Sequence, residues 1–519
     1  MNTVSPPIQE LIRRYRKYLE DEGPNDEVKI QVDEIASKVA AFYEKVRGVI
    51  DYQEGHLLRK AVISRALQRR IFLKDLSGKD IAEPLIKEVI RSGHLGNNSV
   101  QESKILEVQR AVDLILLLLQ KIQSSSYKSG NKTTEWFLGV GVCAIEEILI
   151  APEKERMLGE AVFRIVSENL KINGAQVSEN DKRILLFIAI QKSLFKVDED
   201  RLNYRLLKFI YPNWNDLGPE GADGFGREIF YVRSSVLRYV KHQLLPLFLR
   251  LCNGQRAVFY VLGDLIFGAK DLTNFEEAAQ EVYNERYSRE KVRLFKLAFL
   301  SVISFFLSKI LVALAVEIPI DLYFLGHFSI IHVAANVVFP PFLMFFIVLA
   351  VKMPSEKNLR LVVDGVEKVI FKDQNLSYTI NMPKKRNDLV RFFVELAYAL
   401  IFTALLYYFA GFLLRLGFSA ANVLVFTLFT SLVTATGVKV YNRAKELSLE
   451  RERARFWVFV LDIVTLPLVT VGRWVMTGLK RFNILVLIFN LIIELPFQLF
   501  VEFLENFSSF VRAKKDEIE

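Results

Sequence analysis

Residues 294–316, LFKLAFLSVISFFLSKILVALAV, decide the fold class of this chain, because only Lys296 and Lys309 interrupt an otherwise uncharged stretch. A helix needs about 20 apolar residues to cross a hydrocarbon core about 30 Å thick. Residues 328–351 follow without any formal charge and are also long enough. We therefore predict a transmembrane hairpin over residues 291–351.

A second pair of apolar stretches, 396–414 and 416–438, is separated only by Arg415 and predicts a second hairpin over residues 389–442. Before residue 291 the apolar runs are too short to span a bilayer, so residues 1–290 are predicted to form a soluble multi-helix domain. Proline and glycine cluster over 212–226, which we interpret as a loop and a possible subdomain boundary.

The distribution of basic residues predicts the orientation, because loops retained in the cytoplasm are rich in lysine and arginine. Eight of these basic residues lie in 352–388 and six in 439–455. The turns predicted on the other side of the membrane contain one basic residue, Arg415, and the acidic residues Glu317 and Asp321. The first 20 residues contain no apolar segment of the kind that a cleavable secretory signal needs. We expect a multi-pass protein of the cell membrane with both termini in the cytoplasm.

The last quarter, residues 443–519, allows two interpretations. Its apolar runs contain Asp462 with Pro467 and Glu494 with Pro496, and residues 500–511 have apolar side chains at helical spacing. These segments form either a third transmembrane hairpin or re-entrant and interfacial helices anchored by tryptophan. We favour the second.

The predicted fold is all-α, with a cytoplasmic helical domain followed by a transmembrane bundle. Composition agrees with such a mixture, since 51% of residues are hydrophobic while 24% remain charged. One small β element is expected in the cytoplasmic loop 352–388, where Asp364-Gly365 between apolar runs favours a β-hairpin and residues 377–380 could add a strand.

Motifs that would fix a reaction are missing. No phosphate-binding loop, no H-E-x-x-H metal motif and no G-x-S-x-G nucleophile elbow occurs. Gly139-Val140-Gly141 resembles part of a dinucleotide-binding fingerprint, but the preceding residues do not form a convincing strand, so close helix packing is the better interpretation. Cys143 and Cys252 are expected to be buried free thiols. We predict no catalytic residue, no metal site and no cofactor.

Ionisable residues at membrane depth are the remaining candidates for a functional site. Charge is costly in a bilayer, so such residues often line an ion or proton route. The alternative is a structural role, in which the long side chains extend so that their charged ends reach the membrane interface, or the polar groups form hydrogen bonds inside the protein. The candidates are Lys309, His332, Glu395, Asp462 and Glu494.

The Arg-rich stretch 65–71 and the tract with Leu461-Asp462, Pro467 and Val471-Gly472-Arg473-Trp474, followed by Ile493-Glu494-Leu495-Pro496-Phe497, resemble uncharacterised multi-pass membrane proteins of small-genome bacteria. The resemblance covers mainly these stretches. It implies a membrane fold and no mechanism.

More than half of the chain is predicted to be cytoplasmic, which favours a membrane-anchored scaffold that binds a cytoplasmic protein. A transporter or channel that uses the intramembrane charges is the first alternative, and a lipid-acting enzyme with Asp462 and Arg473 is the second. The expected partners are the lipid bilayer and a cytoplasmic protein. The formal charge of +9 and the basic face 59–70 do not come with a nucleic-acid-binding motif, so no nucleic acid is expected, and the sequence does not give an oligomeric state.

Overall fold

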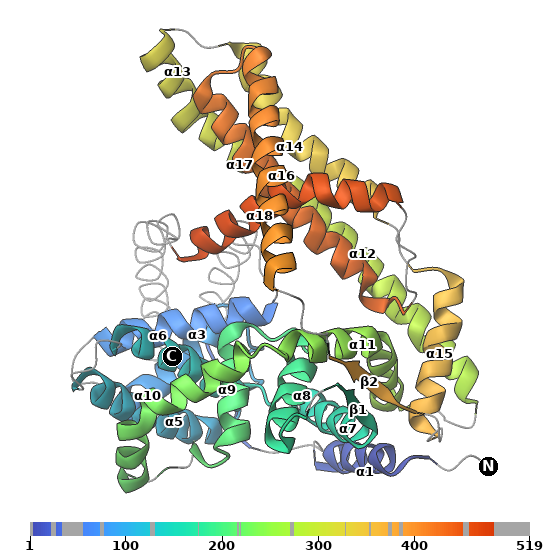
Figure 1. Ribbon diagram of the computed structural model, residues 1–519. Coiled ribbons are helices and arrows are strands. Elements are labelled where there is room, and N and C mark those ends of the chain that lie inside the picture. Colours follow the sequence, from blue (N-terminus) through green and yellow to red (C-terminus); the bar gives the residue numbers. More distant parts are fainter. Residues whose placement is uncertain are drawn as a thin grey trace, which may run out of the picture. The chain divides into compact units, whose positions relative to one another are not determined.

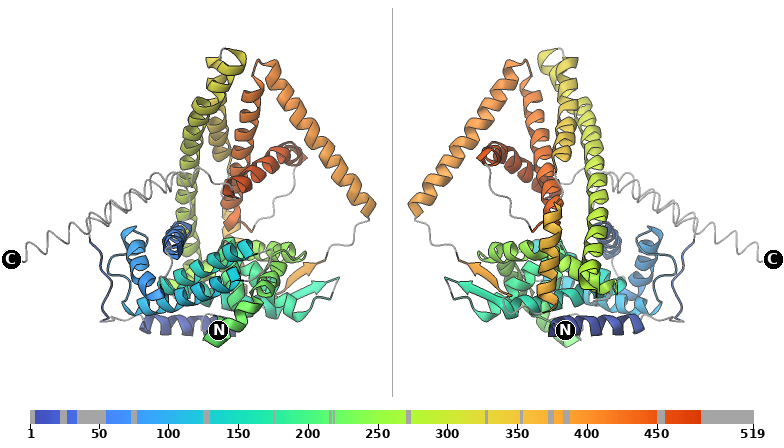
Figure 2. Two further views of the ribbon diagram at one scale, coloured as in Figure 1. Left: turned by 90° about the vertical axis from the view of Figure 1, so that its left-hand side faces the viewer. Right: turned by 90° about the vertical axis from the view of Figure 1, so that its right-hand side faces the viewer.

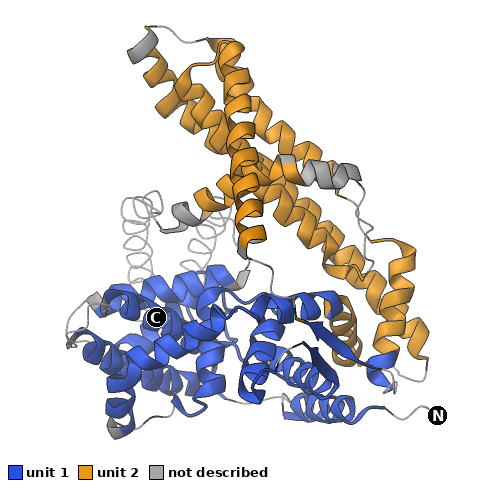
Figure 3. Ribbon diagram, viewed as in Figure 1, with its two compact units in different colours: residues 1–255, 368–381, 490–519 blue, residues 256–367, 382–489 orange. Residues whose placement is uncertain are grey.

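The computed structural model describes residues 4–21, 27–33, 55–72, 77–124, 130–174, 176–214, 217, 219–269, 274–326, 329–351, 354–371, 376–382, 388–449 and 456–481. Helices dominate these ranges, which confirms the all-α prediction there (Figure 1). The chain divides into two compact units (Figure 3). Unit 1 comprises residues 1–255, 368–381 and 490–519, and unit 2 comprises 256–367 and 382–489.

Unit 1 is built from helices that pack through apolar faces, for example α5 against α6 and α4 against α5. Ser178 shows how one of them starts, because its hydroxyl accepts a hydrogen bond from the Asp181 N–H at 3.0 Å and caps the predicted helix. The helices are α1 (Pro6–Asp21), α3 (Gly55–Phe72), α4 (Gly78–Arg91), α5 (Ser103–Ser124), α6 (Gly130–Leu149), α7 (Glu153–Asn169), α8 (Glu179–Leu194), α9 (Glu199–Ile210), α10 (Pro219–Val240) and the first half of α11 (Leu245–Phe267).

The loop predicted over residues 212–226 is only partly correct. Helix α10 begins at Pro219, a residue that suits the first helical turn because its missing N–H has no partner there in any helix. Gly226 lies inside α10, where an added Cβ would meet the Lys121 Cβ at 3.3 Å. Glycine here permits close packing on α5 and does not break the helix.

The hairpin predicted around Asp364-Gly365 is wrong, because both residues lie inside helix α15 (Glu356–Ile370). Val362, Val366 and Val369 recur at helical spacing and are buried, so one face of the helix packs on its neighbours. A Cβ on Gly365 would meet Val258 Cγ2 at 2.6 Å, which explains the glycine by close approach to α11.

The strand expected near residues 377–380 is present as β2 (Tyr378–Asn381). Its partner is β1 (Leu170–Asn173), and the two strands run parallel with Leu170 opposite Tyr378. Both strands belong to unit 1. A parallel pair needs a long connection, so the sequence around β2 could not reveal its partner.

Unit 2 contains the second half of α11 and the helices that follow it. These are α12 (Phe275–Val312), the π-helix η2 (Ala313–Glu317), α13 (Ile318–Leu325), α14 (Ile330–Ala350), most of α15, α16 (Asp388–Arg415), α17 (Ala420–Ala444), the 3₁₀-helix η3 (Lys445–Leu447) and α18 (Phe456–Arg481). Four helical stretches are long and apolar enough to cross a membrane, Phe275–Tyr323, Ile330–Leu349, Phe392–Arg415 and Ala420–Leu447, which indicates a membrane protein. Helix α18 is not among those found in the described part of the chain.

Helix α17 is central in unit 2, where it packs against α12, α14 and α18. Of its most apolar stretch 56% is buried, against 6% for α16. Figure 2 shows α16 leaning away from the other apolar helices, and its contact with α17 runs through Leu413 and Phe426. The side chains on the outer faces are large and apolar, as a lipid environment requires.

The first apolar helix is longer than predicted. It continues without a turn from α12 through η2 into α13 and ends at Gly326, whose φ of 71° is the left-handed conformation that glycine adopts readily. Glu317 and Asp321, expected in an exposed turn, therefore lie within the helix, with 0% and 3% of their surfaces exposed.

Candidate functional site

The only sequence-predicted candidate that is fully buried among the described residues is Lys309 on α12. Its Nζ forms an ion pair with the Glu317 carboxylate and lies 4.7 Å from the centre of the Phe429 ring on α17. Neither charged group reaches solvent. Desolvation of two charges is expensive, and the pair is tolerated because the charges face each other, the Phe429 ring lies beside the ammonium group and Asn336 donates to Glu317.

A continuous chain of polar groups extends from this pair. Asn336 on α14 donates from Nδ2 to the second Glu317 oxygen at 2.7 Å and to the Asn422 carbonyl at 3.4 Å. Asn422 donates from its own Nδ2 to Asp321 Oδ2 at 2.7 Å, and Ser419 donates from its hydroxyl to Asp321 Oδ1 at 2.7 Å. We call these six residues, Lys309, Glu317, Asp321, Asn336, Ser419 and Asn422, the polar cluster.

The π-helix η2 aligns the members of the polar cluster that come from the first apolar helix. A regular α-helix turns by about 100° per residue, so residue 317 would lie about 80° around the axis from Lys309. A π-helical turn accommodates one extra residue, which reduces this offset to roughly 20°. Asp321 follows one α-helical turn after Glu317, so the three ionisable groups share the face that packs on α14 and α17.

His332 has a different role from Lys309. Its Nε2 lies 3.0 Å from the Leu416 carbonyl oxygen, in the turn between α16 and α17. Gly417 in this turn has a φ of 90°, and a Cβ there would meet the imidazole at 3.2 Å. The histidine thus fixes a turn, and no hydrogen bond within the described ranges joins its side chain to the polar cluster.

The other sequence candidates do not join Lys309. Glu395 lies on α16 with an exposed side chain. Asp462 lies on α18, but its side chain is outside what the structure describes, as is the whole of Glu494. Sequence reasoning missed the other five members of the polar cluster as site residues: Glu317, Asp321, Asn336, Ser419 and Asn422. The spacing of four between Glu317 and Asp321 is a signal that a continuous helix would have given, whereas the alignment of Lys309 with both depends on η2, which the sequence does not show.

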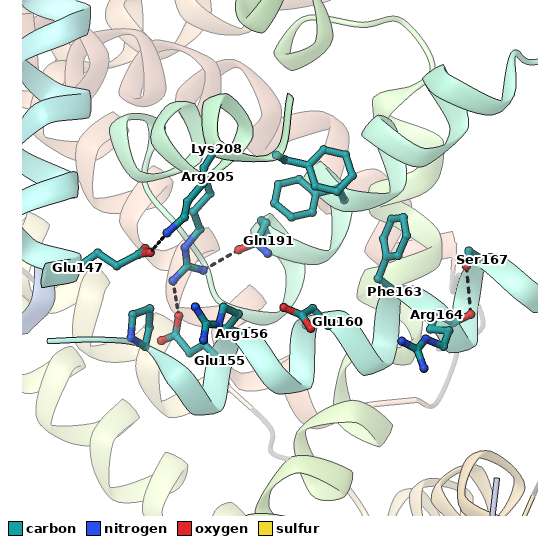
Figure 4. Close-up of a pocket in the computed structure, with 14 residues that line it drawn as sticks. Glu147, Glu155, Arg156, Glu160, Phe163, Arg164, Ser167, Gln191, Arg205 and Lys208 are labelled. Carbon is teal, nitrogen blue, oxygen red and sulfur yellow. Dashed lines mark hydrogen bonds and ion pairs between the residues drawn. The ribbon is translucent and has the colours of Figure 1, made fainter. Parts of the chain in front are cut away.

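A second candidate site is a pocket of about 540 Å³ in unit 1, between α7, α8 and α9 (Figure 4). Its apolar wall consists of three half-buried phenylalanines. The rings of Phe187 and Phe209 are stacked with centroids 4.2 Å apart, and Phe163 meets Phe209 edge to face at 6.1 Å. Aromatic side chains in a concave wall supply large apolar area at little entropic cost, which is typical of binding pockets.

Ion pairs hold the polar side of the pocket. Arg205 donates to Glu155 Oε2 and Gln191 Oε1, both at 2.6 Å, and Lys208 pairs with Glu147 at 2.6 Å (Figure 4). Arg164 also lines the pocket, is exposed, and lies close enough to Glu10 on α1 for its charge to help lower the pKa of that carboxyl. The pocket therefore combines an apolar wall with an exposed arginine that a ligand can reach.

The two cysteines of unit 1 are buried free thiols, as the sequence predicted. Burial raises the pKa of the Cys252 thiol to about 12, although a hydrogen bond from Ser193 opposes the shift. Burial likewise raises the pKa of Cys143. Both thiols are therefore protonated at neutral pH and are poor nucleophiles.

The resemblance to a dinucleotide-binding fingerprint has a structural explanation. Gly139 and Gly141 lie inside α6, with no strand before them, and a Cβ on Gly141 would meet Ile115 Cδ1 at 2.7 Å. Small residues here allow α6 to pack closely on α5. The helix-packing interpretation is confirmed.

The basic face of α3 is largely neutralised within unit 1. Arg59 pairs with the buried Glu146 at 3.0 Å, Lys60 pairs with Asp198 and Asp200, and Arg70 pairs with Glu88 at 2.9 Å. These basic side chains hold α3 against α4, α6 and the N-terminal end of α9.

Comparison of the chain with protein families, curated proteins and solved structures gives no match.

Proposed function

We propose that the protein is a multi-pass, membrane-anchored interaction protein whose unit 1 binds a segment of a cytoplasmic protein. The observation that carries this proposal is the pocket between α7, α8 and α9. The apolar helices of unit 2 support the anchoring role.

The chemistry of the pocket defines its occupant. The stacked rings of Phe187 and Phe209 suit an apolar side chain, and the guanidinium of Arg164 suits a neighbouring carboxylate. A short peptide segment with an apolar anchor beside an acidic residue meets both demands. Such an anchor in a small pocket provides most of the binding energy of many interfaces.

Site-specific photocrosslinking tests this proposal in membranes that contain the full chain. A photoreactive residue replaces Ser167, which lines the pocket, and a control replaces Leu106, a residue on α5 with 50% of its surface exposed. We expect a discrete protein adduct from position 167 and none from position 106. The adduct should map to a segment with an apolar and an acidic residue.

Two further variants decide whether the pocket itself is responsible. Phe209→Ala removes the central ring of the wall, and Arg164→Glu reverses the charge of the exposed arginine. Each should reduce the adduct at position 167 by about tenfold or more, the factor that corresponds to about 1.4 kcal/mol. An adduct that persists in both variants, or that consists only of lipid, contradicts the proposal.

The proposed orientation places both termini and unit 1 in the cytoplasm. Support comes from the lysine and arginine residues of 352–388 and 439–455, which follow the rule for cytoplasmic loops. In this orientation the turn between α13 and α14 and the turn between α16 and α17 lie outside.

Transport is the second candidate function, and one observation favours it. A buried ion pair that continues into further polar side chains inside apolar helices often marks an ion route. Flux of a labelled cation into proteoliposomes tests this function. Equal flux in the wild type and in Lys309→Met would exclude a role of the cluster in transport.

A lipid-acting enzyme is the weakest of the three proposals. It would need Asp462 and Arg473 to act together, and Arg473 has an exposed side chain on α18. Lipid composition in cells with the wild type is compared with that in cells with a variant in which alanine replaces both Asp462 and Arg473. An unchanged lipid composition would contradict the proposal.

A further inference from the structure

The polar cluster carries an unbalanced charge. Lys309 supplies one ammonium group, whereas Glu317 and Asp321 supply two carboxylates, and all three are buried. Lys309 pairs with Glu317, so the charge of Asp321 is the one left over. A buried charge without compensation is strongly destabilising, by an amount comparable to the whole stability of many proteins.

Hydrogen-bond donors surround both carboxylates. Asp321 accepts hydrogen bonds from the Ser419 hydroxyl and the Asn422 amide, and Glu317 accepts one from the Asn336 amide. Donors of this kind stabilise the ionised form of a carboxylate, not the protonated one. The first turn of α17, which begins beside Ser419, adds only a partial positive charge.

Two neutral oxygen atoms of the polar cluster have no hydrogen-bond partner among the described residues. Oδ1 of Asn336 and Oδ1 of Asn422 are buried and accept no hydrogen bond, and their residues are 0% and 2% exposed. Each belongs to an amide whose nitrogen already contacts one of the carboxylates. A reversed amide would point its oxygen at a carboxylate, so this orientation is the favourable one.

From this charge balance and these free oxygens we propose that the polar cluster binds one monovalent metal cation of the Na⁺ type. Asp321 supplies the compensating charge, and the amide oxygens of Asn336 and Asn422 supply neutral ligands. Oxygen atoms are the ligands that such hard cations prefer. A single excess negative charge matches a monovalent ion. This site goes beyond the proposed interaction function and does not require transport.

Binding of labelled Na⁺ to the purified full-length protein in detergent tests the proposal, with choline replacing Na⁺ at equal ionic strength as the reference. We expect saturable binding of about one ion per chain. Asp321→Asn should weaken it by about tenfold or more. Glu395→Gln removes a carboxylate from the exposed helix α16 and is the matched control that should bind as the wild type does.

If Asp321→Asn fails to fold, two further variants that change the net charge of the polar cluster test the cation site. Glu317→Gln leaves one positive and one negative group, so binding should be lost although Asp321 remains. Lys309→Met combined with Glu317→Gln leaves Asp321 alone, so binding should return. Elution as a single species in size-exclusion chromatography confirms folding of each variant.

Several outcomes overturn the proposal. One is saturable binding that does not follow the charge of the cluster. Another is a wild type that binds no Na⁺. If the wild type instead shows only a pH-dependent unfolding temperature that Asp321→Asn abolishes, the compensating ion is a proton and the metal site is refuted.

Discussion

Gly472 shows how strongly a single missing side chain can constrain the apolar helices. A Cβ at this position of α18 would meet the Ser431 carbonyl oxygen of α17 at 2.0 Å and the Ala435 Cβ at 2.8 Å. A backbone atom cannot move aside as the end of a flexible side chain can. Small residues at such crossings let two helices approach closely, which is the main source of attraction between helices in lipid.

Gly472→Ala should therefore destabilise unit 2 by about 1–3 kcal/mol, because the helices must separate to admit the methyl group. The matched control is Gly411→Ala on α16, where a Cβ would meet nothing within 4 Å. Replacing a helical glycine by alanine is otherwise favourable by roughly 0.5–1 kcal/mol. Thermal unfolding of both variants in detergent measures the difference, and equal unfolding temperatures would contradict the close α17–α18 contact.

Cys252 allows a test of burial in unit 1. Its pKa of about 12, against an ordinary value of 9.0, makes the thiolate about a thousandfold rarer at neutral pH. Alkylation by iodoacetamide at pH 8 should be slower than in the urea-unfolded chain by at least this factor, since burial also blocks access. Mass spectrometry of the peptide that contains Cys252 measures the rate. A native rate close to the unfolded one would show that the site is open.

At the scale of elements, the π-helix η2 is the feature on which the polar cluster depends. It lies between α12 and α13 and brings Glu317 onto the face of Lys309. Insertion of one alanine beside Ala315, whose side chain is exposed, adds a further residue that this π-helical turn does not accommodate and should turn Glu317 and Asp321 by about 100° relative to Lys309. The ion pair would break, and two charges would lose their partners.

We expect the alanine insertion to lower the free energy of unfolding by about 3–5 kcal/mol, the cost of breaking a buried pair. Lys309→Met should then cost little in the insertion background, because the pair is already broken, although it is costly in the wild type. Unfolding in denaturant gives the four free energies of this cycle. Additive effects of the two changes would contradict the role assigned to η2.

Helix α15 shows that packing in the folded protein can override a strong local sequence signal. Asp364-Gly365 is a strong turn dipeptide, yet Val362, Val366 and Val369 are buried on one helical face, and Val258 occupies the space beside Gly365. Burial of that face contributes more than the turn preference of two residues. Gly365 is thus explained by the close approach of Val258 and not by the predicted turn.

At the scale of the whole molecule, the number of membrane passes and the orientation are the predictions to test first. Cysteines replace Tyr323, with 83% of its surface exposed, and Leu416, with 52% exposed, near the two turns that are predicted to lie outside. A third replaces the exposed Lys357 at the start of α15. The background carries Cys143→Ala and Cys252→Ala so that only the introduced thiols react.

An impermeant maleimide added to intact cells should label positions 323 and 416 and leave 357 unlabelled until the membrane is opened. This pattern follows from four passes with the basic loops inside. Labelling of position 357 alone would invert the orientation, and labelling at none of the three in intact cells would contradict the two hairpins.

Much of this molecule is determined by its sequence alone. Residues 294–316 and the later apolar stretches indicate membrane-spanning helices because hydrocarbon thickness and the cost of a bare charge act on each segment by itself. The Ser178 cap and the burial of both cysteines follow from equally local rules. The sequence singles out Lys309 as a candidate for the same reason, since its charge lies within an apolar run.

The tertiary structure decides which residues contact Lys309 and which residues surround its ion pair. Glu317 and Asp321 follow an apolar run and resemble an exposed turn in sequence, but α14 and α17 bury them and supply the amides of Asn336 and Asn422. The partner of β2 and the wall of Phe163, Phe187 and Phe209 likewise join residues from separate elements. Such pairings depend on which faces pack together, and packing is a property of the whole chain that no single segment contains.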